Sequence, residues 1–300
     1  MLPLLLASAL WGTTGTAAHF LPSEVSPLAT GAATMTVGGV LLFIVSVHDA
    51  TQVLRDRVAL RWLIPGALGV FAYPLAFYSS MHLAGVAVGT VVSLGSAPVF
   101  AAVIEYAVDR RAIGSRWAVS TALAVAGVVL LGLGGHGTGD GDAAPALGIL
   151  LGLLAGFSYA LYTYASERVI ARGHEPHGVM GSLFGFGAVL LLPVLLATGQ
   201  PLTQSSQSAA ITLYLALGPM FVAYLLFGAG LRWVRSSTAT TITLLEPLVA
   251  TMLAVIVVGE RLGPPGWIGL ALVILGVVLL VLPRRSAEGA VDGLPTAPRL

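Results

Sequence analysis

The chain has 300 residues, of which 57% are hydrophobic and 9% are charged, and its mean hydropathy is +0.94. Soluble domains carry roughly a quarter charged residues, so these values exclude a soluble protein and indicate a polytopic membrane protein. The absence of cysteine excludes disulfide scaffolds and thiol nucleophiles, the absence of lysine excludes a Walker A motif, and the net charge of +1 does not favour nucleic acid as a partner.

Ten stretches of about 18 or more mostly apolar residues are long enough to cross ~30 Å of hydrocarbon as helices. They are residues 2–20, 28–47, 62–82, 86–107, 117–134, 145–165, 178–197, 209–231, 237–258 and 264–282. These stretches lack the alternation of barrel strands and have about twice their length. The predicted fold class is an all-α polytopic membrane protein with ten transmembrane helices.

The arginines lie almost entirely on one side of these predicted helices. Thirteen of the 14 basic residues fall in the loops after the second, fourth, sixth and eighth stretches or after the tenth, whereas Arg261 falls on the other side. Cytoplasmic loops are enriched in arginine, so both termini are predicted to be cytoplasmic and the chain to be integral to the plasma or inner membrane. Residues 284–300 are predicted to form a disordered cytoplasmic tail.

An internal repeat appears when the chain is compared with itself at an offset of 149 residues. The matching segments are residues 67–69 with 216–218, Pro98 with Pro247, and 127–131 with 276–280. The predicted organisation is therefore one five-helix repeat at 1–134, an external linker at 135–144 and a second five-helix repeat at 145–283. Five crossings bring the chain to the opposite side of the membrane, so the second repeat is predicted to be inverted relative to the first. Secondary transporters have this architecture, with a site near the midplane between the repeats.

Several short motifs resemble the EamA-like branch of the drug/metabolite transporter superfamily, over residues 2–283. The motifs are Trp11-Gly12, the sequence LGSAPV at 94–99, LLEP at 244–247, GER at 259–261 and Gly276-Val277. The resemblance implies a carrier, most often an exporter of amino acids, related metabolites or toxic compounds. It also implies a cavity lined by the first, third, fourth, sixth, eighth and ninth predicted helices.

Glu246 is the main candidate for binding chemistry. It is the tenth residue of the 22-residue stretch 237–258, near the bilayer centre, where a charge costs several kcal/mol. Pro247 follows it and Pro98 occupies the matching position in the first half, so both helices are predicted to bend there as hinges. Glu246 is predicted to bind a substrate ammonium group or a coupling proton; the alternative is a protonated carboxyl group that serves packing alone.

Further substrate-binding residues are predicted from their position relative to Glu246. Thr243 shares the helix face of Glu246, and Ser93 and Ser96 form a polar strip on the fourth helix. The aromatic candidates on the first, third, sixth and eighth helices are Trp11, Tyr78, Tyr162 and Tyr224. Interfacial belts and helix packing are the alternative explanation for these rings.

The predicted function is secondary active export of small metabolites, with proton coupling as one option. An importer or exchanger and a non-transporting membrane subunit are the alternatives. An enzyme is not predicted, since the chain lacks HExxH and GxSxG motifs. The predicted partners are a small-molecule substrate, protons and the lipid bilayer, without cofactor or metal and with the oligomeric state left open. The predicted helices contain no arginine, which disfavours strongly anionic cargo.

Overall fold

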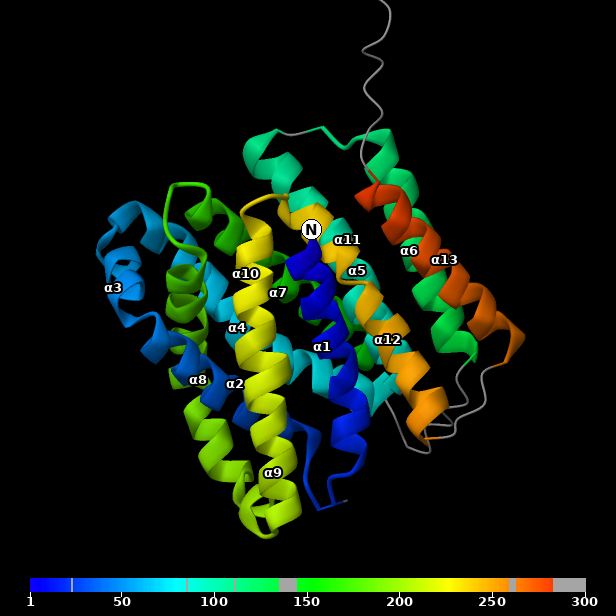
Figure 1. The fold of residues 1–300 in the computed structure, drawn as a ribbon, viewed down its shortest axis with the longest axis horizontal. Coiled ribbons are helices and arrows are strands. Elements are labelled where there is room, and N and C mark those ends of the chain that lie inside the picture. Colours follow the sequence, from blue (N-terminus) through cyan, green and yellow to red (C-terminus); the bar gives the residue numbers. More distant parts are fainter. Residues whose placement is uncertain (23, 85, 111, 135–144, 259–262, 283–300) are drawn as a thin grey trace, which may run out of the picture.

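The computed structural model describes residues 1–22, 24–84, 86–110, 112–134, 145–258 and 263–282. The predicted linker at 135–144 and the predicted tail at 284–300 lie outside the described residues, as does Arg261. The described part is helical and contains no β-strand, and Figure 1 shows its helices gathered into one bundle. The all-α prediction is confirmed.

The first half contains six helices. They are α1 (Leu2–His19), α2 (Pro27–Val45), α3 (Val47–Arg55), α4 (Arg57–Ala84), α5 (Val86–Asp109) and α6 (Ser115–Gly134). The second half is more interrupted. Its elements are α7 (Pro145–Ile170), α8 (Pro176–Thr198), the short 3₁₀ helix η1 (Gln200–Thr203), α9 (Ser206–Leu215), the π-helical segment η2 (Ala216–Val222), α10 (Ala223–Leu231), α11 (Ser236–Ile242), α12 (Leu245–Leu253), the π-helical segment η3 (Ala254–Val258) and α13 (Pro264–Val281).

Eight helical stretches of the described residues are long and apolar enough to cross a membrane, and Ser115–Leu131 is a shorter apolar helix. Each of the ten predicted stretches coincides with one helix or with a chain of consecutive helical elements, the first of them with α1. The polytopic architecture therefore agrees with the sequence, while a count of ten crossings stays a prediction.

Helix α3 was not expected from the apolar stretches, because it is short and amphipathic. Asp49 in its first turn and Arg55 in its last turn complement the helix dipole, and Ala50 and Val53 are its buried side chains. Ser182 of α8 donates a hydrogen bond of 3.2 Å to the carbonyl oxygen of Ala50. Helix α3 thus forms a short connecting segment that packs on the start of α8.

Glycines allow two pairs of helices to approach closely across the halves. Helices α6 and α13 lie side by side (Figure 1), and a β-carbon at Gly127 would stand 2.6 Å from the carbonyl oxygen of Gly269. Helices α2 and α8 form the second pair, where a β-carbon at Gly39 would stand 3.2 Å from the β-carbon of Ala188. Small residues of this kind are the usual means of tight helix packing in lipid.

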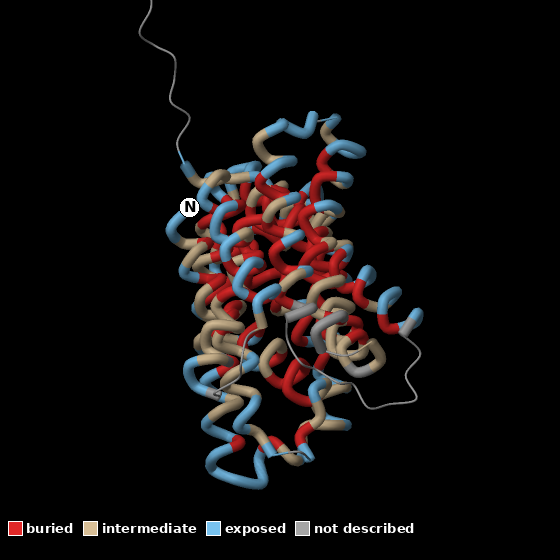
Figure 2. Tube along the Cα trace, turned by 90° about the vertical axis from the view of Figure 1, so that its right-hand side faces the viewer, coloured by how far each residue is buried: buried red, intermediate tan, exposed pale blue. Residues whose placement is uncertain are grey.

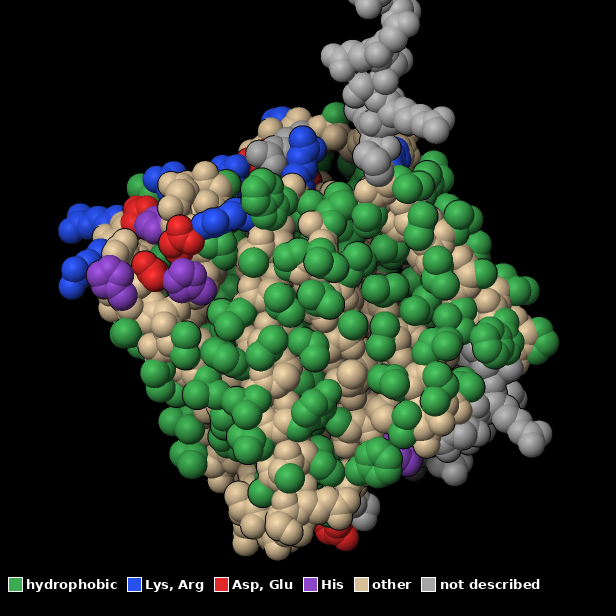
Figure 3. All heavy atoms as spheres, viewed as in Figure 1, with side chains coloured by type: hydrophobic (Ala, Val, Ile, Leu, Met, Phe, Trp, Pro, Cys, Tyr) green, Lys and Arg blue, Asp and Glu red, His purple; other side chains and the backbone are tan. Residues whose placement is uncertain are grey.

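Charged side chains gather at one end of the bundle. Figure 3 shows arginine, acidic and histidine side chains around α3, above a flank covered by hydrophobic side chains. Hydrogen bonds join the α7–α8 connection and the start of α8 to the first half there: His174 lies 3.0 Å from Asp56 and His177 lies 2.7 Å from Asp49. The described C-terminal end of α13 and the N-terminus both lie toward this end (Figure 1). We call it the arginine end.

Buried segments run through the centre of the bundle, and exposed segments cover its outside and its ends (Figure 2). The largest fully buried side chains include Leu42, Leu63, Leu183 and Phe184, which come from α2, α4 and α8. These side chains belong to one continuous hydrophobic core. These side chains therefore fill the space where these three helices meet.

Candidate functional site

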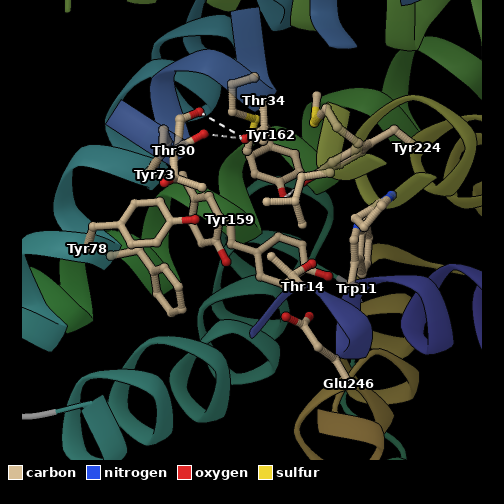
Figure 4. Close-up of a pocket in the computed structure, with 17 residues that line it drawn as sticks. Trp11, Thr14, Thr30, Thr34, Tyr73, Tyr78, Tyr159, Tyr162, Tyr224 and Glu246 are labelled. Atoms are coloured by element: carbon tan, nitrogen blue, oxygen red, sulfur yellow. Dashed lines mark hydrogen bonds between the residues drawn. The ribbon is translucent and has the colours of Figure 1, made fainter. Parts of the chain in front are cut away.

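A cavity lies between the two halves of the chain. The space free of protein atoms in this cavity is about 690 Å³, a volume that includes open solvent. Its walls come from α1, α2 and α4 of the first half and from α7, α9, η2, α10 and α12 of the second half. Figure 4 shows the polar and aromatic side chains of these elements converging on one space.

The cavity lies closer to the end opposite the arginine end. Thr30 lines it from the first turns of α2, which begins at Pro27, and Tyr78 lines it six residues before α4 ends at Ala84. Leu42 and Leu63 lie on the same two helices toward the arginine end, where both side chains are fully buried. The structure is therefore closed at the arginine end and hollowed toward the other end.

Aromatic rings make up much of the cavity wall. The aromatic lining residues are Trp11, Tyr73, Phe77, Tyr78, Tyr159, Tyr162 and Tyr224. Their rings contact one another in a continuous series: the ring centroids of Trp11 and Tyr224 are 5.0 Å apart, and those of Tyr159 and Tyr162 are 5.2 Å apart. The hydroxyl groups of Tyr162 and Tyr224 are 3.1 Å apart and share a hydrogen bond. The wall is thus a connected aromatic surface with hydroxyl groups.

Glu246 is the one acidic residue among the described lining residues, which include no arginine and no histidine. Figure 4 shows its carboxylate pointing toward Thr14 and Trp11 of α1. Within the described part of the chain this carboxylate has no hydrogen-bond donor and no ion-pair partner. The site therefore presents one uncompensated acidic group to a small space bounded mainly by rings.

The helix that carries Glu246 is broken immediately before it. Helix α11 ends at Ile242 and α12 begins at Leu245, and the amide of Glu246 donates to the carbonyl oxygen of Thr243 over 2.9 Å. An unbroken helix would direct the amide of residue 247 to that carbonyl, but Pro247 has no amide hydrogen. The helix is therefore interrupted at Thr243 and Leu244, where hydrogen bonds between residues three apart replace the usual pattern, and Glu246 lies in the first turn of α12.

Gly12 explains how the first helix reaches this acidic residue. A β-carbon at Gly12 would stand 2.9 Å from the carbonyl oxygen of Glu246 and would collide with Val249. Only a glycine allows the backbones of α1 and α12 to cross at this distance. The Trp11-Gly12 pair therefore has two roles, since Trp11 lines the cavity and Gly12 allows α1 to contact the broken helix.

Five of the eight predicted substrate-binding residues line the cavity, namely Trp11, Tyr78, Tyr162, Tyr224 and Glu246. Thr243 lies behind the wall, where its hydroxyl accepts a hydrogen bond of 2.8 Å from Tyr159. Ser93 and Ser96 lie on α5 and face α7: the Ser96 hydroxyl donates 3.3 Å to the Ser93 carbonyl oxygen, beside Gly156.

The family resemblance implied that the fourth predicted helix, now α5, lines the cavity. In the structure the second predicted helix, α2, lines it instead. Helix α2 lines the cavity through Thr30, Gly31, Thr34 and Met35, whereas α5 contributes no described lining residue. The reason is the position of α7, which packs against both α4 and α5 and so separates α5 from the cavity. Pro98 lies within the continuous helix α5, away from the lining residues.

Sequence reasoning missed several lining residues, although spacing contained a signal for some. Tyr159 precedes Tyr162 by three positions and Tyr73 precedes Phe77 by four, which places each pair on one helix face. Thr30 and Thr34 repeat this spacing on α2. Within the described residues, no group of three or more histidine or acidic side chains is arranged to hold a metal ion.

The EamA-like transporter family matches residues 1–133 and 146–282 of this chain. The uncharacterized transporter YwfM of Bacillus subtilis is 33% identical over 294 residues, which is 96% of each chain. The uncharacterized inner membrane transporter YicL of Salmonella typhimurium is 27% identical over 300 residues, 97% of this chain and 98% of its own length.

A solved crystal structure has a similar fold. It superposes with a TM-score of 0.77 over 93% of this chain and 95% of its own, at 21% sequence identity. The family match spans nearly the whole chain, and YwfM and YicL are both named as transporters rather than enzymes. The chain therefore belongs to the EamA-like transporter family.

Proposed function

We propose that this chain is a secondary active transporter that exports small metabolites across the inner membrane, with amino acids and related or toxic compounds as candidate cargo. The observation that carries the proposal is the unpaired carboxylate of Glu246 in a cavity between the two halves. The name of the relative YicL supports the inner membrane. The chain has no lysine for a Walker A motif, so a gradient or a partner supplies the energy in this proposal.

The proposed mechanism is alternating access by two inverted five-helix repeats, residues 1–134 and 145–283. The packing supports a two-fold relation: Gly127 approaches Gly269 and Val273, while Gly276 approaches Ser120 and Ala124. Adding 149 to the residue number in the first half and subtracting 149 from the residue number in the second half converts one set of contacts into the other. Contacts that exchange in this way are expected of two similar units related by a two-fold axis.

The α2–α8 pair supports the same relation. Gly39 and Ala188 differ by 149 residues and lie against each other, as expected for equivalent positions on the proposed axis. In this mechanism the closed arginine end is the cytoplasmic side, with both termini cytoplasmic, because 13 of the 14 basic residues are assigned there by the sequence. The described state then faces outward, and export requires a second state that opens the arginine end.

Comparative metabolite profiling tests the export function. Medium from cells that produce the native chain is compared with medium from cells that produce Glu246→Gln at matched membrane levels. We expect a metabolite that is enriched only with the native chain. The control is Glu175→Gln, an exposed carboxylate outside the cavity that pairs with Arg232 over 2.6 Å, and it is expected to retain enrichment.

Two results would count against the proposal. Equal enrichment with native chain and Glu246→Gln would exclude a role for this carboxylate in binding or coupling. If neither form changes any metabolite in the medium, the result favours an importer or a subunit without cargo. An importer would be tested by measuring uptake instead of release. A proton-coupled exporter also predicts that dissipating the proton gradient abolishes enrichment, whereas exchange driven by the cargo gradient is unaffected.

A further inference from the structure

The charge balance of the cavity restricts what it can bind. Glu246 is the sole ionisable acid among the described lining residues, and no described basic side chain lines the cavity to neutralise it. An isolated charge in an enclosed, ring-bounded site is unfavourable unless an opposite charge accompanies it. A ligand with one positive charge satisfies this requirement, and a ligand with a negative group does not.

The aromatic rings that line the cavity with Glu246 also favour a positively charged ligand. Trp11 has its ring centroid 5.0 Å from that of Tyr224 and 6.5 Å from that of Tyr159. Trp11 and Glu246 line the same cavity, and Figure 4 shows the carboxylate pointing toward α1, the helix that carries Trp11. Aromatic faces attract ammonium groups through the ring quadrupole, and a tryptophan beside tyrosines is the usual arrangement for ammonium groups that carry alkyl substituents.

A zwitterionic amino acid fits this site less well than the corresponding amine. Its carboxylate would enter a space whose described polar groups are the hydroxyls of tyrosines and threonines, the indole of Trp11 and the like-charged Glu246. Carboxylates bind tightly where arginine or lysine pairs with them. The described wall offers neither, so it selects against a second, negative charge.

We propose that the cavity binds organic monocations, meaning amines or quaternary ammonium compounds with an apolar body and no carboxylate. The ammonium group lies between the Glu246 carboxylate and the rings of Trp11 and Tyr159, and the apolar body lies along Tyr73 and Phe77. The inference rests on the proposed transport function and narrows its cargo, removing zwitterionic amino acids from the candidates. A permanently charged ligand is admitted because neither a carboxylate nor a ring face requires a donated proton.

Calorimetric titration of the purified full-length chain in detergent tests this selection without relying on transport. The three probes are benzyltrimethylammonium, phenethylamine and phenylalanine, which share a phenyl body and differ in charge. We expect saturable binding of the two cations and at least roughly tenfold weaker binding of phenylalanine. Glu246→Gln and Trp11→Leu are each expected to weaken binding of the cations by roughly tenfold, the size of one partly desolvated cation–π or charge contact.

Two further variants separate binding from folding. Trp11→Phe keeps a ring at the site and is expected to bind more tightly than Trp11→Leu. Trp233→Leu removes a tryptophan that is 76% exposed and does not line the cavity, so it is expected to bind like the native chain. If Trp11→Phe and Trp11→Leu bind equally, or Trp233→Leu weakens binding as much as Trp11→Leu, the ring contact is refuted.

The outcomes also separate this inference from the proposed function. Phenylalanine that binds as tightly as phenethylamine overturns the selection for monocations, even where metabolite profiling shows Glu246-dependent export. If no probe binds while profiling shows such export, the substrate class is wrong and the transporter proposal stands. If no probe binds and profiling also shows no Glu246-dependent change, both proposals fall. Binding of the cations that is lost in Glu246→Gln supports the inference even when the exported metabolite is unknown.

Discussion

The Tyr159 hydroxyl joins the cavity wall to the broken helix. It donates to Thr243 over 2.8 Å, and the Thr243 hydroxyl donates onward to the carbonyl oxygen of Thr240 over 3.0 Å. We expect Tyr159→Phe and Thr243→Val to be coupled by about 0.5–1.5 kcal/mol in a double-mutant cycle, the range for hydrogen bonds between membrane helices. Thermal unfolding of the four proteins in one detergent measures this coupling, and additive effects would show that the contact does not contribute.

Asp56 provides a prediction about pH at the arginine end. The hydrogen bond from His174 is the largest cause that lowers the pKa of Asp56 from 3.8 to about 2, followed by the hydrogen bond from the amide of Val58. Because the pKa is lower in the folded chain, the ionised carboxylate stabilises the fold above its ordinary pKa, and this contribution is lost as the pH falls from about 4 to about 2.

The measurement is the melting temperature of the native chain and of Asp56→Asn at several pH values. We expect the native chain to melt at a higher temperature than Asp56→Asn at pH 5, where Asp56 is charged, and we expect this difference in melting temperature to disappear toward pH 2. Arg172, which lies 3.8 Å from Asp56, also lowers the pKa of Asp56, as the smallest of the causes, and so contributes to the same change. A difference that is constant over this interval would contradict the assigned pKa.

Sequence reasoning identified Glu246 because a lone acidic residue deep in an apolar stretch is costly wherever it lies. It placed Ser93 and Ser96 in the site for a weaker reason, since a polar strip on a helix does not show which neighbour it faces. Here Gly156 of α7 offers the space that the Ser96 hydroxyl and the backbone carbonyl of Ser93 fill. The orientation of a helix about its own axis depends on tertiary packing, and apolar periodicity is weak when both lipid and protein are apolar.

Glu105 shows the same limit. The sequence places it near a helix end, where contact with headgroups or water is inexpensive. In the structure it is 4% exposed, and its carboxylate accepts hydrogen bonds from the Ser236 hydroxyl over 2.8 Å and the Ser237 amide over 2.7 Å. It therefore satisfies the Ser237 amide at the start of the short helix α11. Glu105 is more than 130 positions from these serines in the sequence, so no local pattern reveals the contact.

At the scale of the helices, the crossing of α1 and α12 depends on one glycine. Gly12→Ala adds a β-carbon that would collide with Val249 and with the backbone of Glu246. We expect it to reduce stability by about 1–3 kcal/mol, as overpacking does, and to reduce export because it displaces the carboxylate. Gly15→Ala is the matched control on the same helix, since a β-carbon there meets nothing within 4 Å.

Thermal unfolding and metabolite export are measured for both alanine variants. If Gly12→Ala behaves like Gly15→Ala in both assays, the close approach of α1 to α12 is not required. The sequence indicated the importance of Trp11-Gly12 only through a family resemblance, and the structure adds a steric reason. The structure also shows an interruption at Thr243 where the sequence predicted a bend at Pro247. The sequence could not distinguish the two, because a proline removes a hydrogen bond without specifying how the chain responds.

For the whole molecule, the histidine–aspartate pairs lie at the arginine end, and the cavity lies toward the other end. His174 with Asp56 and His177 with Asp49 each join the second half to the first. In the proposed alternating-access mechanism, opening the arginine end requires contacts of this kind between the halves to separate. The self-similarity of the chain predicted two similar halves, whereas which side is open depends on small free-energy differences that a sequence pattern does not contain.

The absence of cysteine makes this alternation directly measurable with single introduced cysteines. Thr14→Cys lines the cavity, and Ser182→Cys is fully buried near α3 at the arginine end. With a membrane-impermeant maleimide, we expect Thr14→Cys to react from outside intact cells. We expect Ser182→Cys to react only from the cytoplasmic side in inverted vesicles, and faster once the exported cargo is present, because cargo allows the halves to cycle.

Gln52→Cys, exposed on α3, is the orientation control and is expected to react in inverted vesicles at a rate that cargo does not change. Cargo that shifts the population toward the cytoplasm-open state must slow labelling of Thr14→Cys as it speeds labelling of Ser182→Cys, since one population feeds the other. Reaction of Ser182→Cys or Gln52→Cys from outside would reverse the proposed orientation. Reaction at both ends without this reciprocity would indicate an open pore, because a pore exposes both ends in a single state.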